Sequence, residues 1–274
     1  MASPAPLERG RVRLLEPEGS SRTLLRRRLT ARTYDKPFVA DSGPLRYLHF
    51  GLDNVQSVMR RDEPAELCLG YTRRMMSFLL FEAQPRRILM LGLGGGSLPK
   101  FCYRHLPRAR IRVLEIDPHV IALRDEFQIP ADDRRFTVVR SDCVRYIARR
   151  SVGQDVILLD ACDSHGMARA LEAPDVYPNL RRRLSAQGVL VINVCGDPIA
   201  MASHLARIRG VFGEQLMSLP AREDGNMIVF AFRHLPEIVT GARLDRHARV
   251  LEGRFGLAFP RYARQLERGA THRY

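Results

Sequence analysis

The sequence lacks several features that would assign it to a class of protein at once. It has no tryptophan, and no stretch of 18 or more residues is continuously apolar, so we expect no membrane-spanning helix. Its N-terminus has no apolar signal-peptide core, which favours a cytoplasmic protein. The five cysteines form no CxxC pair and show no zinc-ligand spacing with histidine; they are Cys68, Cys102, Cys143, Cys162 and Cys195. We therefore expect reduced thiols, with neither a disulfide framework nor a metal site.

Lysine is also scarce. Lys36 and Lys100 are the two lysines among 44 basic residues, which leaves 42 arginines, and the formal net charge is +14. Such a balance suits an anionic partner, but the arginines are scattered in twos and threes with little aromatic interleaving. We interpret the charge as a solvated surface and do not expect a nucleic-acid partner.

The most informative segment joins an apolar run to a cluster of glycines. ILML at 88–91 leads into Gly92, Gly94, Gly95 and Gly96, a helix-like segment follows, and a second apolar run ends in Glu115, 19 residues after Gly96. Glycines let a backbone approach a ligand closely, and an acid at the end of the second strand can bind ribose hydroxyls. Ser97 stands where a dinucleotide motif needs Gly or Ala. The pattern therefore favours a single adenosine moiety, as in S-adenosylmethionine, over NAD.

Strand-like and helix-like segments alternate from residue 86 onward. Strands are expected at 87–92, 111–116, 136–140, 155–160, 188–194 and 226–232, with helices at 97–105, 118–127, 142–150, 175–184 and 198–211. This alternation predicts an α/β fold with a Rossmann-like, doubly wound sheet of the S-adenosylmethionine-dependent methyltransferase type. A hairpin near residues 223–226 predicts one antiparallel edge.

The rest of the chain suggests a division into three parts. Residues 1–30 are expected to be an irregular basic arm, and 31–84 a small N-terminal β element with a linking helix at 66–82. Residues 85–274 would form the Rossmann-like catalytic domain and end in a docked, amphipathic helix at 240–274.

Acidic residues follow three successive strands. Asp117 and Asp142 come after the second and third strands, where a helix N-cap is the alternative reading, and Asp160 and Asp163 follow the fourth. The ligand of such a sheet lies beyond the C-terminal ends of its strands. Two carboxylates in one turn beside a sulfonium can hold a cationic amine and accept its proton, which turns the amine into a nucleophile.

These segments resemble the spermidine synthase (polyamine aminopropyltransferase) family over roughly residues 46–232. The similarity rests on Gln56 with Asp62 and Glu63, on the glycine loop, and on residues 115–117, 141–142 and 160–163. The resemblance implies aminopropyl transfer from decarboxylated S-adenosylmethionine to a small-molecule amine, with methylthioadenosine as the coproduct and a homodimer as the assembly.

The resemblance also implies roles for individual residues. Asp160 would be the base, with Asp163 beside it as a second catalytic and substrate-binding acid. Nucleoside binding would fall to the glycine loop and to Gln56, Glu115, Ile116, Asp142, Cys143 and Asp160. The amine would be bound by Asp163 and Tyr177, and Tyr71 is a further candidate for the wall of the amine channel. The tyrosine and glutamate of the family's diamine site are replaced here by Glu66 and Cys68, and Glu66 could bind the substrate in place of the lost acid.

One departure from the family leaves alternatives open. The family's glycine loop carries an aspartate that contacts the donor's amine, and Gly95 stands at that position. A glycine there would tolerate the carboxylate of full S-adenosylmethionine. Three alternatives to aminopropyl transfer therefore stay open. They are methyl or aminocarboxypropyl transfer, a non-catalytic nucleoside-binding homologue, and a nucleic-acid methyltransferase, which only the charge favours.

Overall fold

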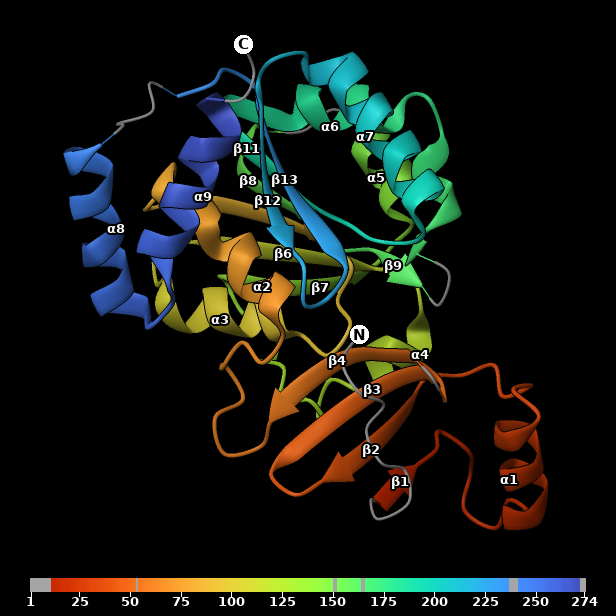
Figure 1. The fold of residues 1–274 in the computed structure, drawn as a ribbon. Coiled ribbons are helices and arrows are strands. Elements are labelled where there is room, and N and C mark those ends of the chain that lie inside the picture. The colour runs from red at the N-terminus through yellow and green to blue at the C-terminus, as the bar shows by residue number, and fades with distance from the viewer. Residues whose placement is uncertain (1–10, 53, 150–151, 164–165, 237–240, 272–274) are drawn as a thin grey trace.

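The computed structural model describes residues 11–52, 54–149, 152–163, 166–236 and 241–271. Its largest sheet has seven strands: β5 (Arg87–Leu91), β6 (Arg110–Glu115), β7 (Phe136–Arg140), β8 (Gln154–Leu159), β11 (Leu184–Val194), β12 (Leu216–Ala221) and β13 (Asn226–Phe232). They lie in the order β12-β13-β11-β8-β5-β6-β7 (Figure 1). The strands from β11 to β7 run parallel, whereas β13 is antiparallel to both of its neighbours.

The parallel strands are buried on both faces, which explains their continuous apolar runs. In β5, Ile88 and Met90 pack into one hydrophobic core, and the alternating Leu89 and Leu91 pack into the other. The predicted α/β class and the antiparallel edge are confirmed. The sequence also located six of these strands to within four residues at each end, and it gave no range for β12.

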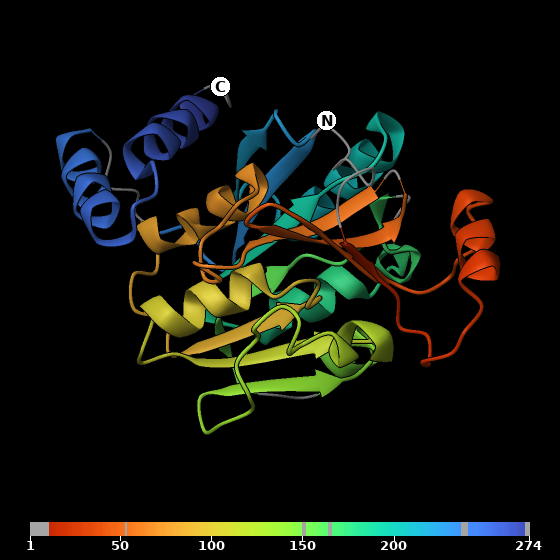
Figure 2. The same ribbon diagram turned by 90° about the horizontal axis from the view of Figure 1, so that it is seen from below.

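Helices cover both faces of this sheet (Figures 1 and 2). They are α3 (Ser97–His105), α4 (Pro118–Ala122), α5 (Cys143–Ala148), α6 (Val176–Arg183), α7 (Pro198–Phe212), α8 (Ala242–Phe255) and α9 (Phe259–Thr271). Buried residues of α5, α6 and α7 join one core, and those of α3, α8 and α9 join the other. The single C-terminal helix expected at 240–274 is instead two helices, because Gly256 adopts a left-handed φ of 68° that ends α8.

The N-terminal part contains a second, antiparallel sheet of β1 (Arg11–Arg13), β2 (Phe38–Ser42), β3 (Leu45–Gly51) and β4 (Asn54–Arg60). Two elements lie within the stretch expected to be irregular: β1, and the helix α1 (Arg22–Thr30). No residue of α1 is buried, so this helix leaves no apolar periodicity in the sequence. Both views place α1 on the opposite side of the molecule from α8 (Figures 1 and 2).

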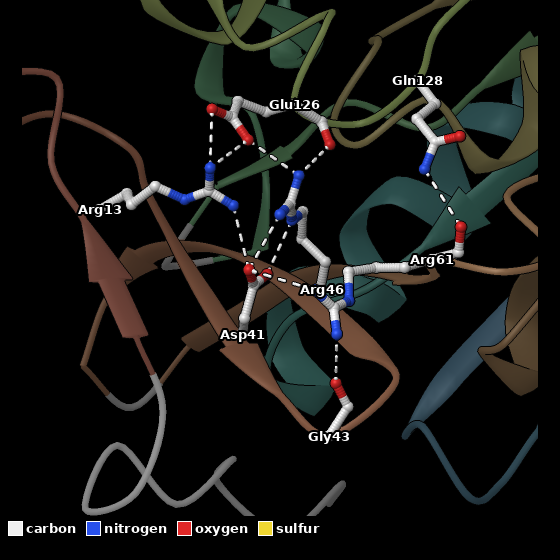
Figure 3. A network of polar contacts seen from close by, with 7 residues as sticks. All are labelled: Arg13, Asp41, Gly43, Arg46, Arg61, Glu126 and Gln128. Carbon is white, nitrogen blue, oxygen red and sulfur yellow. Dashed lines mark hydrogen bonds and ion pairs between the residues drawn. The ribbon is translucent and has the colours of Figure 1, made fainter.

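A network of ion pairs fixes the N-terminal sheet to the larger domain (Figure 3). Arg46 donates two hydrogen bonds to Asp41 and also bonds the Glu126 carboxylate at 2.8 Å. Arg13 bridges the same two acids, at 3.0 Å to Asp41 and 2.9 Å to Glu126. Because Glu126 belongs to the segment after α4, the network sets the position of the small sheet relative to the glycine loop.

The linking segment forms two short helices, α2 (Gly70–Met75) and η1 (Met76–Leu80), where one helix at 66–82 was expected. All five residues of η1 are buried, and its hydrophobic side chains pack into the core. No helix in the described ranges is long and apolar enough to cross a bilayer.

Candidate active site

A cavity of about 320 Å³ opens at the C-terminal ends of β5, β6, β7 and β8, with β4 and α2 contributing to its wall. The predicted site residues that line it are Gln56, Gly92, Gly94, Gly95, Glu115, Ile116, Asp142, Cys143 and Asp160. These residues are far apart in sequence. The fold gathers them because parallel strands deliver their C-terminal ends to one edge of the sheet.

The glycine loop passes directly over the end of β8. Gly92 has a φ of 103° and donates its N–H to the Leu114 carbonyl at 2.9 Å. A Cβ atom on Gly92 would overlap the Asp160 carbonyl oxygen, so this residue must be glycine. Gly96 does not line the cavity; it precedes α3 with a φ of 68° and packs against Ile129.

Gly95 faces a serine from the N-terminal sheet. A Cβ atom on Gly95 would lie 2.6 Å from Ser57 Oγ and 3.0 Å from a ring carbon of Phe127. The Ser57 hydroxyl in turn lies 3.4 Å from that of Ser97, and both serines line the cavity. A pair of hydroxyls therefore occupies the space into which a longer side chain at residue 95 would extend.

Glu115 holds the glycine loop in place. Its Oε2 accepts a hydrogen bond from the Leu93 N–H at 2.9 Å, and its Oε1 accepts from the N–H groups of Ile116 (2.8 Å) and Asp117 (2.9 Å). A carboxylate has about four acceptor positions, so about one remains for a ligand. A ribose diol would therefore share this acid with the backbone that it orders.

Three further residues line the part of the cavity beside β6 and β7. Asp142 caps α5, since its Oδ1 accepts from the N–H groups of Val144 (2.8 Å) and Arg145 (3.4 Å), so the N-cap alternative considered for this residue is present. Ile116 is 64% exposed and offers an apolar surface. Burial raises the pKa of Cys143 to about 11, which keeps its thiol protonated at neutral pH.

Asp160 is the carboxylate at the end of β8, and two side chains orient it. Asn193 Nδ2 donates to Oδ1 at 2.8 Å, and the Tyr71 hydroxyl donates to Oδ2 at 3.3 Å. Asn226 Nδ2 donates to Asn193 Oδ1 at 3.0 Å, which fixes the orientation of the Asn193 amide. Burial raises the pKa of Asp160, and these two hydrogen bonds oppose that rise.

Sequence reasoning missed Asn193 and Asn226. The available signal was a polar residue inside an apolar strand run, VLVINV at 189–194, since a buried amide in a strand requires a partner. Asn193 is 2% exposed and finds that partner in Asp160.

Gln56 joins the N-terminal sheet to the loop after β8. Its Nε2 donates to the Cys162 carbonyl oxygen at 2.7 Å, and both residues line the cavity. This contact is the reason that the small sheet forms part of the site wall.

Two of the predicted substrate-binding residues do not line the cavity. Tyr177 belongs to α6, is 2% exposed in the core, and hydrogen-bonds Nδ1 of His204 in α7 at 3.1 Å. Glu66 is 50% exposed and faces Arg60, with 3.4 Å between Oε2 and Nε. Asp163 has its backbone in the two-residue strand β9 (Cys162–Asp163), and its side chain lies outside the described part of the chain.

The expectation of reduced thiols is wrong for two cysteines. Cys162 and Cys195 form a disulfide, while Cys68, Cys102 and Cys143 are free. No cysteine spacing predicts this pair, because the two residues are 33 positions apart. They meet because each follows one of two neighbouring strands, β8 and β11, at the same edge of the sheet.

The charged residues of the cavity wall are all acidic. They are Glu115, Asp117, Asp142 and Asp160, and no Lys, Arg or His lines the cavity within the described ranges. In a chain of net charge +14, this is a local reversal of sign, and it suits a cationic ligand. Among the described residues, no group of three or more His, Cys, Asp or Glu side chains is arranged to hold a metal ion.

Comparison with known proteins gives similar results for sequence and structure. Residues 69–209 match the model of the spermine/spermidine synthase domain. A polyamine aminopropyltransferase of Chromobacterium violaceum is 37% identical over 84% of this chain and 88% of its own length. The structure of human methyltransferase-like protein 13 in complex with SAH is 26% identical and covers 74% of this chain and 93% of that one, with a TM-score of 0.58. A probable spermidine synthase of Corynebacterium glutamicum shares the fold, with a TM-score of 0.66 at 19% identity over 81% of this chain and 86% of its own.

Proposed function

Because the chain belongs to the spermine/spermidine synthase family, we propose that it transfers an aminopropyl group from decarboxylated S-adenosylmethionine to a small-molecule amine. The observation that carries the proposal is the cavity wall, whose charged residues are all acidic and include the oriented carboxylate of Asp160. Both reactants are cations, and both enter a cavity that favours positive charge.

The nucleoside part of the donor fits the part of the wall beside β6 and β7. Glu115 would accept a hydrogen bond from the ribose, and Asp142 would face the adenine amino group. The exposed side chain of Ile116 would lie against the adenine ring. The donor could approach the backbone of the glycine loop closely at Gly94. No protein atom lies within 4 Å of the position that a Cβ atom on Gly94 would take, so this space is open.

Asp160 would act as the base. The acceptor's nitrogen attacks the donor carbon next to sulfur, a C–N bond forms, the C–S bond breaks, and methylthioadenosine leaves. Asp160 takes the proton of the amine, because Tyr71 and Asn193 occupy about two of its four acceptor positions and leave the others for the ligand. Burial raises the pKa of Asp160 toward neutral pH, and a general base is most effective when its pKa lies near the working pH.

The same wall supports a decarboxylated donor. A donor carboxylate about 6 Å from one acid would be repelled by about 3 kcal/mol at an effective dielectric constant of about 20. No basic side chain lines the cavity within the described ranges to offset that repulsion.

Methyl transfer from S-adenosylmethionine is the second candidate. Two observations favour it: residue 95 is glycine where an aspartate would mark an aminopropyltransferase, and the similarity extends to a human methyltransferase-like protein in complex with SAH.

The deciding experiment supplies each donor separately with a panel of diamines and follows the release of methylthioadenosine and of S-adenosylhomocysteine. We expect methylthioadenosine from the decarboxylated donor, and a loss of about 10²- to 10⁴-fold in kcat for Asp160→Asn, the range for a general base. Asp35→Asn, at a 75% exposed carboxylate, is the matched control. Turnover of S-adenosylmethionine alone would select the second candidate, and donor binding without turnover would select a non-catalytic homologue. The homodimer implied by the family resemblance is tested separately by light scattering.

A further inference from the structure

Asp160 and Asn193 lie just beyond the paired part of two neighbouring strands. The last paired residues of the parallel strands β8 and β11 are Leu159 and Ile192. One residue further along, Asn193 Nδ2 bonds Asp160 Oδ1 at 2.8 Å. Two residues beyond that, the Cys162–Cys195 disulfide closes a small ring that contains both the carboxylate and the amide that orients it.

The ring also contacts the N-terminal sheet. The carbonyl oxygen of Cys162 accepts the hydrogen bond of Gln56 at 2.7 Å, so the disulfide holds the contact point of the N-terminal sheet. A Cβ atom on Gly166 would lie 2.9 Å from Gly196 Cα and 3.1 Å from the Cys195 carbonyl oxygen, so β10 (Gly166–Met167) packs closely on the other end of the ring.

We propose that Cys162 and Cys195 are a positioning pair for the transfer reaction, and that a dithiol reductant releases it and lowers the rate. The reductant supplies two electrons and two protons; the S–S bond breaks, two S–H bonds form, and the dithiol becomes a disulfide. Once the bond is broken, the hydrogen bond from Asn193 to Asp160 and two weak sulfur contacts between Cys162 and Asn193 remain across the ring among the described residues, and the geometry of Asp160 loosens.

The location of the pair makes it reachable. Cys162 is partly exposed and lines the cavity, whereas Cys195 is 8% exposed. A thiolate entering by the route of the substrates therefore meets the Cys162 sulfur first. Cys68 is a free, partly exposed thiol that lies outside both the ring and the cavity wall, and it offers a matched control.

This inference rests on the proposed function for its kinetic readout, but its first test does not. Thiols of the native protein, purified without reductant, are counted with a chromogenic disulfide. We expect three reactive equivalents on denaturation without reduction, and five after treatment with dithiothreitol. Five equivalents without reduction would overturn the proposal even if transfer activity is present.

The second test compares oxidised and reduced wild type, so no substitution has to fold. We expect reduction to lower kcat at least about tenfold, to leave the dissociation constant of methylthioadenosine within about threefold by calorimetry, and to be reversed by reoxidation. Cys195→Ser should behave as the reduced enzyme and be insensitive to dithiothreitol, while Cys68→Ser should keep the full response. An unchanged kcat after complete reduction would overturn the proposal.

A readout specific to positioning is the acidic limb of the pH profile of kcat/KM. The groups that face the Asp160 carboxylate are the Asn193 amide and the Tyr71 hydroxyl, and Asp224 accepts the Tyr71 N–H on its far side. Loss of the Asn193 bond removes an interaction that lowers the pKa of Asp160, so reduction should move this limb to higher pH. A limb that stays in place while kcat falls would assign the disulfide to general stability and overturn the positioning role. An absence of turnover in every redox state would instead refute the proposed function, and the thiol count would still decide whether the disulfide exists.

Discussion

Replacing Lys100 with methionine should stabilise the protein strongly at low pH and progressively less as the pH rises. Lys100 lies in the first turns of α3, directly behind the glycine loop, and is 4% exposed. Its Nζ donates to the Phe127 carbonyl oxygen at 2.7 Å. Burial lowers its pKa from 10.5 to about 7, because the charged ammonium is costly to hold away from water.

The sign and size of the effect follow from proton linkage. Between about pH 7 and pH 10.5 the unfolded chain keeps the lysine proton that the folded chain has lost. The free energy of unfolding of the wild type therefore rises with pH, by up to about 1.4 kcal/mol per pH unit. From about pH 6 to about pH 9 this amounts to about 2.7 kcal/mol. The methionine variant has no such term, so its advantage over the wild type should shrink by that amount.

Urea unfolding of both proteins at about pH 6, 7, 8 and 9 measures this difference directly. Lys36→Met is the matched control, since it removes the other lysine of the chain, one that is paired with Glu16 at 3.0 Å and lies outside the core. A difference between Lys100→Met and wild type that is the same at about pH 6 and about pH 9 would refute the assignment of a buried, readily deprotonated lysine.

Three further predictions concern the cavity. Asp160→Asn should raise the melting temperature at neutral pH while it removes activity. Burial raises the pKa of Asp160 in the folded protein, so the wild type loses stability as the pH rises from the unfolded-state pKa to the folded-state pKa, and the asparagine variant does not. Calorimetric scans that show a lower melting temperature for the variant at neutral pH would contradict this. Gly92→Ala should destabilise the protein by about 2 kcal/mol or more, because its Cβ would overlap the Asp160 carbonyl. Gly94→Ala should lower the free energy of unfolding by only about 1 kcal/mol, the cost of an alanine in the left-handed conformation, because its Cβ meets no atom within 4 Å. Equal urea midpoints for the two variants would refute the argument. Glu115→Gln should weaken methylthioadenosine binding about 10- to 100-fold in titration calorimetry, since one backbone N–H would lose its charged acceptor, and unchanged affinity would remove Glu115 from the site.

The fold could be predicted because both faces of the main sheet are buried. Strands such as β5 are then unbroken apolar runs, and the helices between them alternate regularly. Elements outside that core gave no comparable signal. α1 buries no residue, and the stop at Gly256 depends on a left-handed backbone conformation rather than on an apolar pattern.

The site was predictable where it depends on strand ends, and not where it depends on contacts between strands. Asp160, Glu115 and Asp142 follow strands, and the parallel arrangement brings them to one cavity. The bond from Asn193 to Asp160 and the Cys162–Cys195 disulfide require knowing that β11 lies beside β8. That neighbourhood is a property of strand order, which the sequence does not state.

The packing of Ser57 against Gly95 restricts the routes by which this pocket could change its donor. A carboxylate introduced at residue 95 would force its neighbours to shift, because its Cβ would lie 2.6 Å from Ser57 Oγ and 3.0 Å from a ring carbon of Phe127. A smaller residue at position 57 would relieve the first of these contacts but would by itself bring no new interaction. The effect of a mutation at residue 95 should therefore depend on the side chain at residue 57, although one position lies in the glycine loop and the other in the N-terminal sheet.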